Sequence, residues 1–169
     1  MATHRIPILG FAHPSGGTAG AVFPEPYGIK ATNDVWQRLV WIFNDTATRD
    51  GLHSGFVVPK NYVGGGAFVV VWTATATTGA VVWDVEYRTV AGDDTTSLDQ
   101  AGTEESLTVT DAAPGASHRR LEASMAATAA NFVADDEVEV VLFRDGASAS
   151  DTMAAAAILF EFLFQYTDA

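Results

Sequence analysis

Alternation of apolar and polar residues is the feature that most limits how this chain can fold. In the stretch 83–88, one set of alternate positions is apolar and the other is polar: Trp83, Val85 and Tyr87 against Asp84, Glu86 and Arg88. Successive side chains of a β-strand point to opposite faces of a sheet, so this pattern predicts a strand with one buried and one wet face. A similar alternation at Glu137–Arg144 predicts a second such strand.

The stretch Gly66–Val90 reads as two long strands joined by a tight turn at Thr77–Ala80. We therefore expect a hairpin at the centre of the fold. The first strand is apolar on both faces at Phe68–Trp72, which is typical of a strand covered by a second sheet or by a partner subunit.

Further strands are expected along the rest of the chain. The segments are Asn33–Phe43, His53–Pro59, Glu105–Thr110, His118–Thr128 and Ala154–Tyr166. Three of them also have helical features: apolar residues of Asn33–Phe43 fit one face of a helix, His118–Thr128 is rich in alanine, and Ala154–Tyr166 is the strongest competitor for a helix. In the last segment, phenylalanine on every second residue favours a buried strand, with Phe160 and Phe162 on the same face.

About eight strands separated by turns predict an all-β fold, an antiparallel two-sheet sandwich of the jelly-roll kind. One core is expected to contain side chains from three of these strands: Trp83, Val85, Tyr87, Val140, Phe160 and Phe162. The sandwich domain is expected to span residues 33–169.

Residues 1–32 are expected to form an extended N-terminal arm, because prolines and glycines recur there at spacings that a helix or a central strand would not tolerate. The arm is nonetheless apolar, so it should lie against its own core or against another subunit. Its candidate partner-binding residues are Ile6, Ile8, Leu9, Phe11, Val22, Phe23 and Tyr27.

The formal net charge is -12, from 9 Lys and Arg against 21 Asp and Glu. Binding to nucleic acid or to an anionic membrane needs clustered positive charge, so neither is expected as a partner. The absence of cysteine excludes disulfides, thiolate nucleophiles and cysteine-ligated metal sites. We also expect no export signal and no membrane-spanning helix, because the apolar patch near the N-terminus is short and contains Pro7.

No sequence motif indicates catalysis, a metal or a cofactor. The histidines His4, His13, His53 and His118 lack the close spacing of zinc ligands. No serine lies in a nucleophile elbow. Asp84 and Glu86 form a pair of carboxylates, and the placement of Glu86 on the polar face of a strand resembles that seen in sandwich glycosidases. Such pairs are common by chance in an acidic chain. The acidic loops near Asp93 and at Asp145–Asp151 contain possible calcium ligands, although turn formation explains them without a metal. We therefore expect a protein that is not an enzyme.

Three features carry a resemblance to small virion proteins of tailed bacteriophages. They are the loop Pro59–Tyr62, the tryptophans Trp72 and Trp83 of the long strands, and the passage Arg144–Asp145–Gly146 followed by Asp151–Thr152–Met153. Over residues 33–167 the chain resembles these jelly-roll proteins, which include capsid decoration (cement) proteins and components of fibres or spikes.

The resemblance implies a homotrimer that binds the major capsid protein or other virion subunits and reinforces the assembled head. Such a protein would be made in the bacterial host cytoplasm and located on the virion, on the capsid surface rather than the tail. The alternative is a tail fibre, spike or carbohydrate-binding receptor module. In that case one of the tryptophans would stack on sugar rings: Trp36, Trp41, Trp72 or Trp83.

Overall fold

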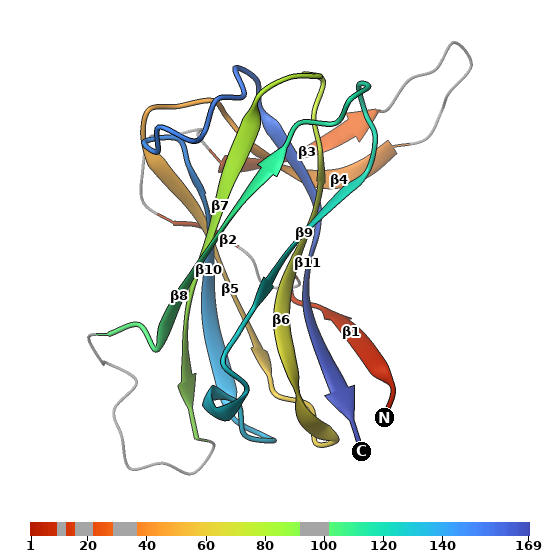
Figure 1. The fold of residues 1–169 in the computed structure, drawn as a ribbon, viewed down its shortest axis with the longest axis vertical. Coiled ribbons are helices and arrows are strands. Elements are labelled where there is room, and N and C mark those ends of the chain that lie inside the picture. Colours follow the sequence, from red (N-terminus) through yellow and green to blue (C-terminus); the bar gives the residue numbers. More distant parts are fainter. Residues whose placement is uncertain (10–12, 16–21, 29–36, 92–101) are drawn as a thin grey trace.

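The computed structural model describes residues 1–9, 13–15, 22–28, 37–91 and 102–169. In this part of the chain, two antiparallel sheets pack face to face as a β-sandwich (Figure 1). The predicted all-β, jelly-roll-like sandwich is therefore confirmed. In the described residues, no helix has both the length and the apolar character needed to cross a membrane.

The six-stranded sheet has the order β3-β4-β11-β6-β9, and β1 pairs with β11 beside this path. Its strands are β1 (Thr3–Pro7), β3 (Val22–Gly28), β4 (Gln37–Phe43), β6 (Tyr62–Thr73), β9 (Leu121–Ala126) and β11 (Ala157–Asp168). In the described residues, the three segments with helical features contain strands, namely β4, β9 and β11, and no helix.

The five-stranded sheet has the order β2-β5-β10-β7-β8. Its strands are β2 (His13–Ser15), β5 (Arg49–Val57), β7 (Ala80–Val90), β8 (Glu105–Ala112) and β10 (Glu137–Asp145). A short 3-10 helix, η1 (Ala129–Asn131), lies between β9 and β10 in the chain.

The expected central hairpin is wrong, because β6 and β7 lie in different sheets. The connecting segment 74–79 crosses from one layer to the other, and Gly79 makes the corner with φ of 89°. A Cβ atom there would come within 2.6 Å of the Thr152 carbonyl oxygen, so the corner needs glycine. Alternation identifies the face that a residue occupies but not the neighbouring strand, and here Trp72 and Trp83 meet across the core with ring centroids 5.8 Å apart.

The main core lies between the sheets, and most of the predicted core residues are in it. Trp83, Val85, Tyr87, Val140 and Phe162 are all buried there. Phe160 is the exception: it belongs to a second cluster, on the outward face of the six-stranded sheet, with Val69, Val71 and other residues of β4, β6 and β11. The Arg38 guanidinium lies 5.0 Å from the centroid of the Phe160 ring.

A β-bulge explains why Phe160 and Phe162 lie on opposite faces. In the pairing of β11 with β6, Leu159 lies opposite Trp72 and Glu161 lies opposite Val71, so Phe160 is an extra residue. One inserted residue reverses the faces of everything after it. Leu159 and Phe162 therefore both point into the main core, while Phe160 points outward.

Residues 1–32, expected as an extended arm that lies against its own core or another subunit, are described in part. Where they are described, they form strands of the sandwich: β1 pairs with β11, β2 with β5 and β3 with β4. Pro24 and Pro26 are compatible with β3 because, among the described strands, β3 lies at the end of its sheet and has no outer neighbour that would need the missing N–H groups. Packing on its own domain thus describes these ranges, and the expected boundary between residues 32 and 33 falls outside the described residues.

One end of the sandwich is held by Arg144, whose side chain is 1% exposed. Its guanidinium donates to the Asp151 carboxylate at 2.8 and 3.0 Å, and to Asp45 at 3.2 Å. It also donates to the carbonyl oxygens of Met153 and Ala155, each at 2.7 Å. Two residues of the passage that carries the virion resemblance, Arg144 and Asp151, therefore form a buried ion pair. This ion pair fixes the chain between β10 and β11.

Replacing Phe162 by alanine should lower the free energy of unfolding by about 3–5 kcal/mol, because the ring is fully buried and its removal leaves a cavity. The measurement is chemical denaturation followed by tryptophan fluorescence. The control is Leu39→Ala, at a side chain 73% exposed, which should change stability by less than about 0.5 kcal/mol. Equal losses in the two variants would contradict the described core.

Replacing Arg144 by methionine should cost about 3–5 kcal/mol, because Asp151, which is 2% exposed, would keep its charge in a buried site without a cation. The same denaturation experiment measures this loss. Arg38→Met is the matched control: Arg38 is 52% exposed and pairs with Glu161 at 3.4 Å, so its loss should cost less than about 1 kcal/mol. A small effect at both positions would show that the Arg144 pair is dispensable.

Candidate binding site on the five-stranded sheet

On the outward face of the five-stranded sheet, polar side chains in two neighbouring rows surround an apolar centre. In the register of β5, β10 and β7, Val141 lies opposite His53 on one side and Glu86 on the other. The next row contains Glu139, opposite Gly55 and Arg88. Residues that lie opposite each other in a sheet share a face, so these two rows form one surface.

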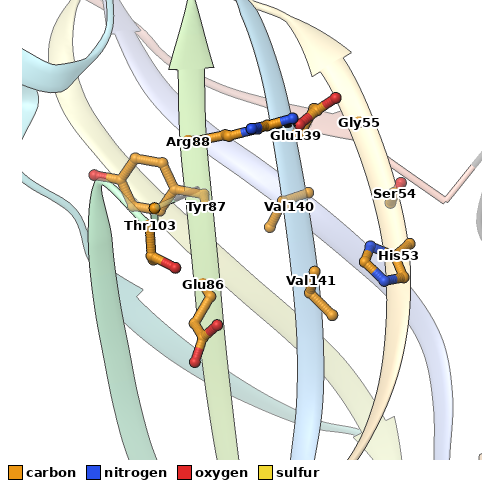
Figure 2. Close-up of a pocket in the computed structure, with 11 residues that line it drawn as sticks. His53, Ser54, Gly55, Glu86, Tyr87, Arg88, Thr103, Glu139, Val140 and Val141 are labelled. Atoms are coloured by element: carbon orange, nitrogen blue, oxygen red, sulfur yellow. Dashed lines mark hydrogen bonds and ion pairs between the residues drawn. The ribbon is translucent and has the colours of Figure 1, made fainter. Parts of the chain in front are cut away.

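An open pocket of about 600 Å³ lies over these rows. We call it the sheet pocket; Figure 2 shows its lining residues on β7, β10 and β5 side by side. Gly102 and Thr103, which precede β8, add to the lining. Gly55 adds no side chain to the β5 side of the pocket. A Cβ atom at this position would lie 3.0 Å from the Val138 carbonyl oxygen.

Ion pairs link the charged side chains in and beside the pocket. Arg88 donates from Nε to the Glu139 carboxylate. Arg49 donates to Glu86 at 2.6 Å and to Asp84 at 3.0 Å. Burial acts to lower the pKa of Arg49, but the hydrogen bonds and charges of the two carboxylates outweigh it and raise that pKa.

Arg49 also covers an aromatic ring next to the pocket. Its guanidinium carbon lies 3.8 Å from the centroid of Phe143, which lies opposite Asp84 in the sheet. A cation over a ring face gains from the ring quadrupole. Phe143 is therefore occupied by Arg49, and Val141 is the apolar centre of the pocket.

Behind the pocket, Tyr87 connects β7 to β8 and η1. Its hydroxyl donates to Glu105 and accepts a hydrogen bond of 3.0 Å from the Asn131 side chain. Glu105 in turn accepts from the Thr128 backbone N–H at 2.9 Å. The Glu104 N–H donates to the Tyr87 carbonyl oxygen at 2.8 Å, which joins the residue before β8 to β7. These contacts hold β8 and the residues before it, which add to the pocket lining, next to β7.

The network shifts the pKa values of both acidic members. Burial and then the hydrogen bond to Glu105 raise the pKa of Tyr87 well above 10. For Glu105, burial acts to raise the pKa, but the hydrogen bonds from Tyr87 and Thr128 outweigh it and lower that pKa.

None of the candidate partner-binding residues whose side chains the structure describes lines the sheet pocket. Ile8 and Val22 are buried in the main core, while Ile6 and Leu9 pack against it partly exposed. The Ser54 hydroxyl donates to the Ile8 carbonyl oxygen, which fixes this part of the chain to β5. Phe11 lies outside the described residues, and Phe23 and Tyr27 are placed only as backbone positions of β3.

The tryptophans expected as sugar platforms do not reach the pocket where they are described. Trp72 and Trp83 are fully buried between the sheets, and Trp41 packs partly buried against the same core. Trp36 lies outside the described residues. A sugar platform at Trp72 or Trp83 is therefore wrong, because neither ring is accessible.

The possible calcium ligands of the loop Asp145–Asp151 have other partners in the fold, whereas the acidic loop near Asp93 lies outside the described residues. Asp151 pairs with Arg144, and Asp145 accepts a 3.2 Å hydrogen bond from the Ala147 N–H within its own turn. His13 and His53 are brought opposite each other in the register of β2 and β5. Among the described residues, no group of three or more His, Asp or Glu side chains is arranged to hold a metal ion.

The amino-acid sequence indicated the wet face of β7 but not the pocket. The alternation at 84–88 placed Glu86 and Arg88 on the polar face, and both line the pocket. The alternation at Glu137–Arg144 likewise placed Glu139 and Val141 on one face, whereas His53 gave no such signal. None of these patterns indicated that the three residues lie near Glu86 and Arg88, because that proximity depends on the order β5-β10-β7.

No family model matches the chain, and no curated protein matches it either. Solved structures do share its fold. A family 35 carbohydrate-binding module from Clostridium thermocellum matches with a TM-score of 0.55 and 11% identity, over 99% of both chains. The CBM22-1 xylan-binding domain of Paenibacillus barcinonensis Xyn10C matches with a TM-score of 0.52 and 13% identity, over 99% of this chain and 94% of that one.

A third match lies within a larger protein. Isomaltodextranase from Arthrobacter globiformis T6, complexed with panose, has a TM-score of 0.53 and 13% identity, over 96% of this chain and 23% of that one. At these identities the likeness establishes the fold. The chain thus has a jelly-roll β-sandwich fold like that of carbohydrate-binding modules.

The Tyr87–Glu105 network should make stability depend on pH at both extremes. The lowered pKa of Glu105 contributes stability above its usual 4.5, and this is lost as the pH falls through the lowered value. The raised pKa of Tyr87 contributes stability below pH 10 that is lost as the pH rises above 10. Glu105→Gln should therefore weaken the acid loss and Tyr87→Phe the alkaline loss.

The measurement for this prediction is the urea midpoint as a function of pH. Glu25→Gln, at an exposed position on β3, is the control and should retain the wild-type profile. Unchanged profiles in both network variants would contradict the assignment.

Proposed function

We propose that this protein is a carbohydrate-binding module that binds a saccharide in the sheet pocket without catalysis. The observation that carries the proposal is a pocket with both polar and apolar lining groups on the outward face of the five-stranded sheet. Two of the structures with the same fold are carbohydrate-binding modules by name. Fold alone does not define function, so the support comes from the chemistry of the pocket.

The pocket chemistry matches the two kinds of surface that a sugar ring offers. A sugar presents an apolar C–H face and, around its edge, hydroxyl groups that both donate and accept hydrogen bonds. Val141 provides a small apolar centre for the first. Around it, Glu86 and Glu139 provide acceptors, Arg88 provides donors, and His53 provides a ring nitrogen of either kind.

Binding accounts for the carboxylates better than hydrolysis does. A glycosidase needs a pair of carboxyl groups, one of which protonates the leaving oxygen. Here Glu86 accepts from Arg49 at 2.6 Å and Glu139 accepts from Arg88, so both act as acceptors in ion pairs. A role in recognition is the simpler assignment for both.

The second candidate is the virion role, which rests on the sequence resemblance. The side chains of Arg144, Asp151 and Met153, which carry the resemblance, are buried together at one end of the sandwich, so they support the fold rather than a particular partner. A homotrimer on a phage capsid or tail, bound to capsid protein or other virion subunits, stays a prediction. The mass of the protein in solution and its location on particles would test it, and a receptor-binding virion protein would combine both roles.

Val141→Arg should weaken the affinity for saccharides at least about tenfold, because a long charged side chain would fill the apolar centre of the pocket. The measurement is retardation in native gels that contain soluble polysaccharides, with circular dichroism to check the fold. Val133→Arg is the matched control: this valine is 61% exposed and lies outside the pocket, so binding should be unchanged. Equal retardation of both variants would overturn the assignment of the pocket.

A further inference from the structure

We propose that the sheet pocket selects uncharged saccharides, and that Glu139 is a specificity-determining residue that excludes carboxylated ones. This inference rests on the proposed function and adds a ligand class to it. It follows from how the charges of the pocket are paired.

The guanidinium groups at the pocket are already paired with carboxylates. Arg88 donates to Glu139, and Figure 2 shows its side chain extending across from β7 toward β10. Arg49, at the neighbouring row, donates to both Glu86 and Asp84. An anionic sugar could pair with either arginine only next to a carboxylate that the protein already holds there, so the two carboxylates would repel each other and compete for the same guanidinium.

The local charge also opposes an anion. The paired groups are two arginines and three carboxylates, Glu86, Glu139 and Asp84, so their formal sum is +2 and −3, or −1. The whole chain carries a formal charge of -12, which repels polyanions before contact.

A neutral hydroxyl does not face this competition. It can accept from a guanidinium N–H and donate to the paired carboxylate at the same time, so both ion-pair partners gain a hydrogen bond without separating. The Arg88–Glu139 pair spans β7 and β10 in one row, next to Val141, and so presents a donor and an acceptor side by side at the apolar centre. Two adjacent sugar hydroxyls match that arrangement.

Removing the charge of Glu139 should therefore relax the selection. Glu139→Gln keeps the size of the side chain and an acceptor oxygen, but frees Arg88 from its ion pair. Glu137→Gln is the matched control: it is the same substitution on the same strand and the same face, at an exposed residue outside the pocket, with the same change in net charge. Only a pocket-specific effect distinguishes these two variants.

The test is affinity gel electrophoresis of the full chain and both variants with paired polymers. Two neutral and anionic pairs are used: hydroxyethyl cellulose with carboxymethyl cellulose, and methyl-esterified with unesterified polygalacturonate. Galactan and dextran serve as further neutral probes. The wild-type protein should bind a neutral polymer at least about tenfold more tightly than its anionic counterpart, as expected for one charge-assisted hydrogen bond. Glu139→Gln should reduce that ratio about tenfold, and Glu137→Gln should leave it unchanged.

Each other outcome overturns a defined part of the proposal. If the wild-type protein binds an anionic polymer as tightly as its neutral counterpart, the inference is wrong while the saccharide-binding function stands. If Glu139→Gln and Glu137→Gln give the same ratio, the selection comes from overall charge and Glu139 does not determine it. If no polymer retards the wild-type protein, the proposed function fails together with the inference.

Discussion

The buried Arg144–Asp151 ion pair is the interaction on which one whole end of the sandwich depends. A charge with 1% exposure is costly to bury, and the cost is offset only where the surrounding groups use nearly all of its donors. Arg144 donates to Asp151, Asp45 and the carbonyl oxygens of Met153, Ala155 and Phe43. It therefore connects β10 of one sheet with the end of β4 and the approach to β11 in the other.

Aromatic packing beside the ion pair closes the same end of the core. Arg144 lies opposite Trp83 in the register of β10 and β7. The Trp83 ring contacts Phe43 and Trp72, with centroids 5.3 and 5.8 Å apart and near-perpendicular planes. The segment that carries Asp151 also binds β7, because the Ala80 N–H donates to the Thr152 hydroxyl at 3.0 Å. Two sheets that share no backbone ladder are joined here by side chains.

A rigid interior leaves the outward face of the five-stranded sheet available for recognition. The core side of β10 holds Val138, Val140, Leu142 and Arg144, all buried, while its outward side holds Glu139 and Val141 in the pocket. The neighbours β5 and β7 add His53, Glu86 and Arg88 from rigid strands rather than from loops. Such a surface is preorganised, so little conformational entropy is lost when a ligand binds.

The sequence by itself determined the fold class, most of the strand segments and the wet face of β7, because period-two alternation is a local property of a strand. It did not determine which strands are neighbours: β6 and β7 were expected to pair, yet they lie in opposite sheets. Nor did it reveal the bulge at Phe160, since one extra residue in a ladder is defined only by the partner strand. The pocket was decided by tertiary structure for the same reason: Glu86, Glu139 and His53 are far apart in the chain, and only the order β5-β10-β7 brings them together.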